Sequence, residues 1–173
     1  VMDTKAWELI GQVLGWLSFF LWSFSFYPQA WVNYQTKSVE GFSVEYGLIN
    51  PIGYLMYSIY NLQGIVSPSV GDTGEIDVND LIFSLHGFAL SAVHLTQVLI
   101  HDQGSQKKSN RGFRVFLVLL VAGIFITVGT MFTLEVWNPS LISQRWFTIR
   151  MCGYSKAAIT LVKYMPQVYL NYQ

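Results

Sequence analysis

Charged side chains are scarce in this chain of 173 residues. Asp, Glu, Lys and Arg together make up 12% of it, about half of the roughly 25% that a soluble domain carries. So large a deficit argues against an ordinary soluble domain. The formal net charge is zero, and the sequence therefore shows no basic footprint for nucleic acid.

Cysteine is nearly absent as well, because Cys152 is the single one. One thiol can form neither a disulfide within the chain nor a cysteine-based metal site. Three histidines, with no convincing metal spacing, are interpreted as neutral, hydrogen-bonded side chains: His86, His94 and His101. The sequence has no recognisable nucleophile–base pair or phosphate-binding loop, so we expect no enzyme activity, no cofactor and no metal.

Long apolar runs are what the sequence has in abundance. Four stretches of at least 20 residues contain no Asp, Glu, Lys or Arg, and a membrane-spanning helix needs about 20 mostly apolar residues. They lie between Glu8 and Lys37, between Glu45 and Asp72, between Asp80 and Asp102, and between Arg114 and Glu135. A small soluble helical bundle has no room for four such runs, so each predicts a membrane-spanning helix.

A fifth span is predicted from about Leu141 to Asn171. It is less apolar than the others because it contains Arg150, Lys156 and Lys163. The stretches between these cations are long and apolar, which favours a helix. The fold class is therefore an all-α membrane protein with five transmembrane helices.

The loop charges predict an orientation, because cytosolic loops carry an excess of Lys and Arg. With five spans, the 1–2 and 3–4 loops share one side, and they hold five cations: Lys37, Lys107, Lys108, Arg111 and Arg114. The other side has only Lys5 and Arg145, together with an acidic 2–3 loop that contains Asp72, Glu75 and Asp77. The N-terminus is thus expected to face away from the cytosol.

An internal repeat links the first and fifth spans. Residues 28–35 read PQAWVNYQ and residues 166–173 read PQVYLNYQ. Sequence repeats inside membrane spans are typical of transporter folds. Since spans one and five run in the same direction, the repeat is expected to be parallel, with two three-helix bundles and a linking helix between them.

That 3+1+3 arrangement predicts the domain organisation. The first bundle covers residues 1–101, a cytosolic loop 102–112, the linking helix 113–135, and the first helix of an incomplete second bundle 136–173. Two further helices are expected after Gln173, so that five of seven are present here.

Polar residues form a stripe beside each repeated proline. Proline in a helix interior removes a backbone hydrogen bond and can kink the helix, so Pro28 and Pro166 are predicted hinges. Gln29 and Asn33 share one helix face, as do Gln167 and Asn171, and these four amides are predicted to bind substrate. In the second copy the stripe extends back through Lys163 to Lys156, and an anionic substrate group would suit Lys163.

Simpler interpretations remain for these residues. The amides could join helices to one another, and Lys156 could extend to the membrane interface. Asp80, at the start of the third span, could carry a proton, since carboxylates inside membranes often serve proton relays; alternatively, Asn79 or Asp80 could cap the helix. Asn50 lies at a polar, proline-broken point of the second span, and Trp22 could either wall a cavity or merely pack.

Several motifs together resemble the PQ-loop transporter family, and within it the members that export cystine from lysosomes with protons. The resemblance runs along essentially the whole chain. The motifs are Gly15-Trp16, Trp22-Ser23, Ser25–Gln29, Lys37–Ser43, Asn79-Asp80, Phe83–His86 and Thr160–Gln167.

The resemblance implies a SWEET-like fold with a lumenal N-terminus in the lysosomal, vacuolar or late endosomal membrane. It implies that five residues lie in or near the substrate cavity: Trp22, Asn50, Lys156, Lys163 and Asn171. It implies that Asp80 belongs to a proton pathway, that cystine and protons are the transported species, and that cytosolic nutrient-signalling proteins are partners.

Two other functions remain open at this point. The chain could transport another amino acid or a sugar, although lysines in the cavity disfavour a cationic substrate and have no obvious role with a neutral sugar. It could also be a non-transporting receptor or scaffold that binds a cytosolic partner through the basic segment Lys107–Arg114.

Overall fold

The computed structural model describes residues 4–66, 76–104, 106, 111–138 and 146–172. Five helices run along these residues: α1 Thr4–Thr36, α2 Val44–Val66, α3 Val78–Ile100, α4 Arg111–Trp137 and α5 Trp146–Asn171. The predicted all-helical class is confirmed, and the described residues form no named strand. Several predicted loop charges lie outside the described residues: Asp72, Glu75, Lys107, Lys108 and Arg145.

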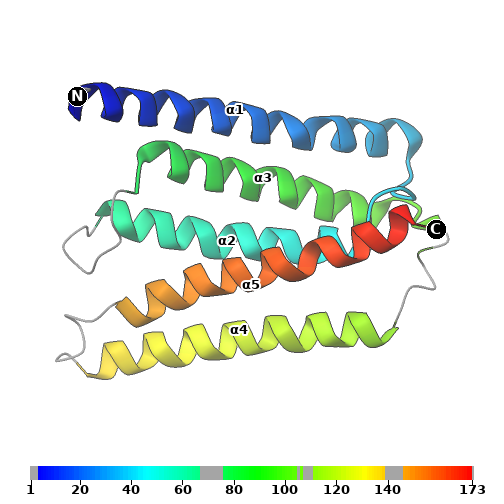
Figure 1. Ribbon diagram of the computed structural model, residues 1–173. Helices are drawn as coiled ribbons and strands as arrows, with labels where there is room; N and C mark the ends of the chain where they lie inside the picture. The colour runs from blue at the N-terminus through cyan, green and yellow to red at the C-terminus, as the bar shows by residue number, and fades with distance from the viewer. Residues whose placement is uncertain (1–3, 67–75, 105, 107–110, 139–145, 173) are drawn as a thin grey trace.

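The helices lie side by side and alternate in direction along the chain (Figure 1). α1 and α5 run the same way, so both repeated PQ segments lie at one end of the bundle, which we call the motif end. α2 is central, packed most extensively against α3 and α5, while α1 packs on α3 and α4 packs on α5. The direction of α1 and α5 agrees with the parallel repeat predicted above.

Three helices, α1, α3 and α4, are long and apolar enough to cross a membrane among the described residues. The lower hydropathy of α5 was expected. α2, one of the five predicted helices, also falls short of that hydropathy criterion. The reason is its central position: α2 buries polar side chains such as Asn50, Ser58 and Asn61 against its neighbours, whereas α1 and α4 expose large apolar side chains along their lengths.

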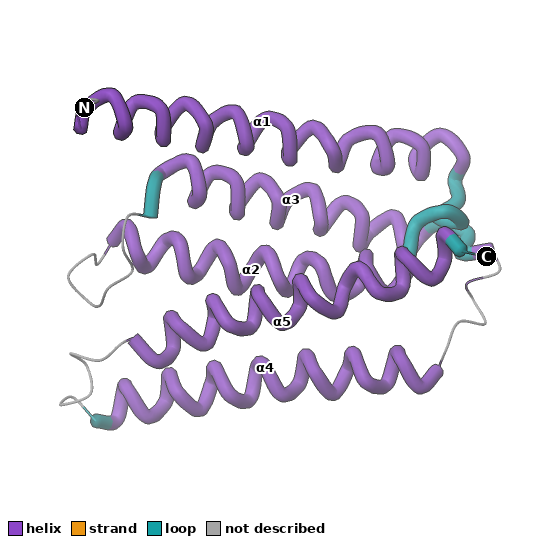
Figure 2. The backbone as a smooth tube through the Cα atoms, in the orientation of Figure 1, coloured by secondary structure: helices purple, strands orange, loops and turns teal. Residues whose placement is uncertain are grey.

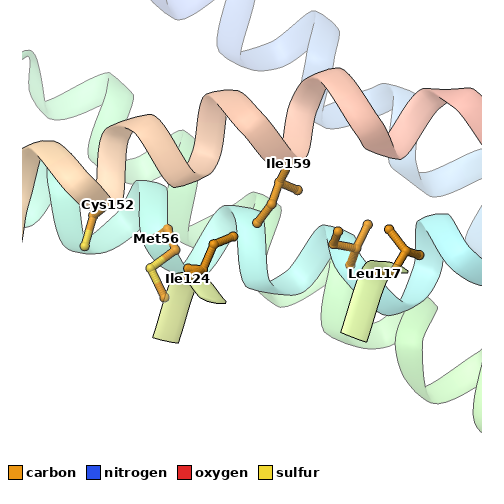
Figure 3. Close-up of a cluster of buried hydrophobic side chains, with 6 residues drawn as sticks. Met56, Leu117, Ile124, Cys152 and Ile159 are labelled. Carbon is orange, nitrogen blue, oxygen red and sulfur yellow. The ribbon is translucent and has the colours of Figure 1, made fainter. Parts of the chain in front are cut away.

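An apolar cluster joins α2, α4 and α5 (Figure 3). Its buried members are Ile49, Met56, Leu117, Ile124, Cys152 and Ile159. Because lipid tails are as apolar as these side chains, close packing supplies the attraction between membrane helices. Gly53 permits it here, since a Cβ at that position would lie 2.9 Å from Ile159.

The segment that connects α1 to α2, residues 37–43, is held tightly at the motif end (Figure 2). Lys37 follows the last residue of α1 and has a positive φ of 53°, a left-handed conformation common just after a helix. Val39 N–H donates to the carbonyl of Asp102 at 2.9 Å. The buried Gln106 side chain donates to the carbonyls of Val39 and Phe42, both at 3.1 Å. These bonds anchor the connection to the end of α3.

Candidate ligand-binding cavity

A cavity of about 260 Å³ lies between α1, α2, α3 and α5. This is just under the roughly 300–1,000 Å³ that is common for small-molecule sites. Its walls are mostly aromatic, with polar groups from both PQ segments. The lining residues are Trp22, Ser25, Phe26, Gln29, Phe42, Tyr46, Tyr54, His94, Tyr164 and Gln167.

Three of the predicted substrate-binding residues line this cavity directly: Trp22, Gln29 and Gln167. Trp22 is largely exposed, which places it at the rim. Gln29 and Gln167 are the glutamines of the two PQ segments, 138 positions apart (167 minus 29). The tertiary structure therefore brings the sequence repeat together around one space.

Each of the two PQ segments contains an equivalent internal hydrogen bond. Gln29 Nε2 donates to Asn33 Oδ1 at 2.8 Å, and Gln167 Nε2 donates to Asn171 Oδ1 at 3.1 Å. In both copies the glutamine amide is oriented by the asparagine one helical turn later, as the i, i+4 spacing predicts. The repeat in the sequence is thus a repeat in geometry.

Beyond that shared bond, the two copies differ. Asn33 is buried and donates to Gln97 Oε1 of α3 at 3.0 Å, and Gln97 donates in turn to the carbonyl of Ala30 at 2.8 Å. Asn33 therefore joins α1 to α3 and does not line the cavity. Asn171 is exposed at the motif end, where it serves Gln167.

Gln167 itself holds the α1–α2 connection. Its Oε1 accepts the N–H of Ser43 at 2.9 Å, and its Nε2 donates to the carbonyl of Gly41 at 3.3 Å. The second PQ segment is therefore hydrogen-bonded to the α1–α2 connection, which follows the first PQ segment in the sequence. This contact joins α5 to the α1–α2 connection at the motif end, beside the cavity.

Lys163 and Asn50 meet behind the aromatic wall. Lys163, only 2% exposed, donates from Nζ to Asn50 Oδ1 at 2.9 Å. Three tyrosine rings of the cavity wall surround the ammonium at 4.9 to 5.4 Å: Tyr46, Tyr54 and Tyr164. No described carboxylate lies within salt-bridge distance of Lys163, so a cation–π environment holds the charge.

Lys156 also lies against the Tyr54 ring. Its Nζ lies 4.3 Å from the centre of the Tyr54 ring and 5.7 Å from that of Tyr57. Tyr54 therefore contacts both predicted lysines. Gly87 of α3 makes space for this ring, because a Cβ at position 87 would collide with it.

Asp80 lies at the opposite end of the bundle from the PQ segments (Figure 1). It is half-buried in the first turn of α3, and its carbonyl accepts a hydrogen bond from Asn61 of α2 at 3.0 Å. The alternative interpretation of Asn79 or Asp80 as a helix cap is confirmed in part: Asp77 occupies the N-cap position without a side-chain capping bond, and Asn79 Oδ1 accepts the backbone N–H of Asp80 at 3.0 Å. Asp80 does not line the cavity.

The predicted hinges lie within continuous helices. α1 passes through Pro28, α5 through Pro166 and α2 through Pro51 without interruption. The hinge function of Pro28 and Pro166 stays a prediction.

The histidines differ in their partners. The interpretation of His86 as hydrogen-bonded agrees with its 2.9 Å contact to the hydroxyl of Tyr27. For His94 it is not confirmed, because neither ring nitrogen has a hydrogen-bond partner of normal geometry among the described residues, although the side chain is only 3% exposed and the backbone of Phe26 lies near the ring. A histidine on an apolar helix gives no sequence signal for this, since the missing partner is a tertiary property.

The basic segment Lys107–Arg114 is not a free patch along its whole length. Arg114 belongs to α4, where its Nε lies 3.0 Å from Glu45 Oε1 and its Nη2 donates to the carbonyl of Gln106 at 2.9 Å. It therefore ties α4 to the start of α2. This weakens the receptor interpretation, which needs these cations for a cytosolic partner.

The helices and the cavity together define a helical membrane protein with an aromatic, amide-lined binding space between two copies of one motif. The PQ loop repeat family matches residues 10–70 and 148–173, and the chain belongs to this family. Both matched segments contain a PQ glutamine that lines the cavity.

Relatives extend this similarity over nearly the whole chain. It is 34% identical to cystinosin of Bos taurus over 183 residues, which cover 99% of this chain and 47% of that protein. It is 32% identical to a cystinosin homolog of Dictyostelium discoideum (98% and 60%) and 28% identical to a cystine transporter of Saccharomyces cerevisiae (94% and 67%). The chain spans about half the length of the bovine relative.

Proposed function

We propose that this chain is part of a proton-coupled transporter that exports cystine from the lysosome lumen to the cytosol. The observation that carries the proposal is the convergence of both PQ glutamines on one cavity. Support also comes from relatives named cystinosin and cystine transporter. The proposed setting is a lysosomal or vacuolar membrane, with the N-terminus lumenal and the motif end cytosolic, as the loop cations indicate.

The chemistry of the cavity suits cystine. Cystine carries two ammonium and two carboxylate groups joined by an apolar disulfide linkage. Aromatic walls can pack against the linkage, while the amides of Gln29 and Gln167 can bind the charged ends. Lys163 has no described carboxylate partner, so a cystine carboxylate could supply its counter-charge if the tyrosines that separate them move aside.

Transport requires the cavity to open alternately to each side. In the proposed 3+1+3 arrangement, α1–α3 form the first bundle, α4 the link and α5 the first helix of the second bundle. Gln167 then joins the bundles through Ser43 and Gly41. Breaking these two bonds, with bending at Pro28 and Pro166, would open the motif end.

Proton coupling is assigned to Asp80, which lies half-buried at the proposed lumenal end. Its carboxyl group would load a proton from an acidic lumen. Because Asp80 does not line the cavity, its protonation would act through α3 and its contact with Asn61 of α2.

The test is uptake of labelled cystine by the full-length protein expressed at the plasma membrane, at acidic and at neutral outside pH. Uptake that is larger at acidic pH supports cystine–proton symport. A protein that reaches the surface and takes up no cystine at either pH contradicts the proposal, and amino acids or sugars would then be tested in the same assay.

A further inference from the structure

His94 of α3 is a buried polar group in the cavity wall that lacks a well-formed hydrogen bond. The side chain is 3% exposed, and neither Nδ1 nor Nε2 has a hydrogen-bond partner of normal geometry among the described residues; the backbone of Phe26 lies near the ring but outside that geometry. Burying a polar group without a partner is unfavourable. Structural histidines in protein interiors are normally hydrogen-bonded, so packing alone does not explain this one.

A series of aromatic contacts connects His94 to the surroundings of Lys163. Its ring lies 6.0 Å from Phe26 and 5.0 Å from Phe42, measured between centroids. Phe42 contacts Tyr46 at 5.5 Å, and the Tyr46 ring lies 5.3 Å from Lys163 Nζ. The cavity therefore has an imidazole on the α3 side and an ammonium behind the α5 side, separated by aromatic rings.

We propose that His94 is a ligand-binding residue of this cavity, whose ring N–H donates a hydrogen bond to a carboxylate of the bound substrate. The identification of this substrate as cystine rests on the function proposed above. A ligand with two carboxylates at its two ends fits a cavity with separate donors: one carboxylate lies toward Lys163 and Asn50, and the other is bound by His94.

A structural role and a binding role predict opposite results for His94→Leu. Leucine removes the two unpaired nitrogens and retains apolar volume, so the unliganded protein should unfold at the same temperature as the wild type or at a higher one. If His94 binds a carboxylate, the same variant should bind cystine about tenfold more weakly, as expected for loss of one hydrogen bond to a charged group.

The experiment measures cystine binding and thermal unfolding of the purified full-length protein in detergent. The variants are His94→Leu and His94→Gln, with His101→Leu as the matched control outside the cavity. Glutamine keeps a donor and should retain most of the affinity, and the control should bind as the wild type does. Cystine monoamide, which keeps one carboxylate, should be bound almost equally by the wild type and His94→Leu.

Three outcomes would overturn the proposal. The first is a leucine variant that binds cystine as tightly as the wild type. The second is a leucine variant whose unliganded form is strongly destabilised, since that shows a structural role. The third is a wild type that binds no cystine, which overturns the proposed function and the ligand assigned to His94 together; the first two leave the proposed function standing.

Discussion

Lys163 Nζ lies 2.9 Å from Asn50 Oδ1, and this hydrogen bond joins two residues 113 positions apart in the sequence. The bond connects α5 to α2, and it lies directly behind three tyrosines of the cavity wall. The side-chain amide nitrogen of Asn50, Nδ2, has no hydrogen-bond partner among the described residues. The pair thus offers an ammonium and a free amide donor beside the cavity.

Replacing Lys163 with methionine should strongly reduce cystine transport while the protein still folds. The change removes a buried charge and keeps the apolar stem, so stability should be preserved or improved. Cystine uptake should fall at least about tenfold, because a charged hydrogen bond to the substrate is lost. Uptake is measured beside Lys5→Met, an exposed lysine of α1, which should behave as the wild type. Normal uptake by Lys163→Met would remove this residue from the site.

Asn33→Ala tests whether the first asparagine stabilises the bundle or binds substrate. The change leaves the buried Gln97 oxygen without its donor, which should destabilise the protein by about 1–3 kcal/mol. The Michaelis constant for cystine should stay close to that of the wild type, because Asn33 does not line the cavity. Thermal unfolding and uptake kinetics are measured together. A raised Michaelis constant with unchanged stability would instead place Asn33 in the substrate site.

Gly87→Ala should impair both stability and transport. The added methyl group collides with the Tyr54 ring, and overpacking of this kind costs about 1–3 kcal/mol. Displacing Tyr54 also disturbs its contacts with Lys156 and Lys163. The matched control is Gly123→Ala in α4, where a Cβ has nothing within 4 Å and where alanine favours the helix. Equal behaviour of the two variants would contradict the packing of Tyr54 on Gly87.

Asp80→Asn should remove the dependence of uptake on pH. Asparagine can neither bind nor release the coupling proton, so the ratio of uptake at acidic and neutral pH should approach one. The control is Asp77→Asn, since Asp77 is exposed and its side chain makes no capping bond. Uptake that stays acid-stimulated in Asp80→Asn, as strongly as in the control, would assign the proton to another group.

Much of the fold could be predicted from local pattern. The scarcity of charge, the long apolar runs and the repeat at Pro28 and Pro166 predicted five helices, and the structure confirmed them. These features depend on composition and on spacing along one helix, which is why a sequence shows them. The hydrogen bond from Gln29 to Asn33 is of the same kind, because residues four apart are neighbours on any helix.

The identity of the cavity wall could not be predicted in this way. Phe26, Phe42, Tyr46, Tyr54 and Tyr164 line it, but many other aromatic residues of this chain face outward. An aromatic residue has the same local signal in either position. Only the packing of neighbouring helices decides which ring meets the cavity and which meets lipid.

The sequence by itself determined that this protein is a helical membrane protein with a repeated PQ segment, because hydrophobic runs and motif spacing are properties of the chain alone. Only the tertiary structure decided that Gln29 and Gln167 share a cavity, that Lys163 bonds to Asn50, and that His94 lacks a well-formed hydrogen bond among the described residues. Each of these depends on which side chains from different helices come into contact. Such contacts depend on how α1, α2, α3 and α5 pack, and no single segment encodes that packing.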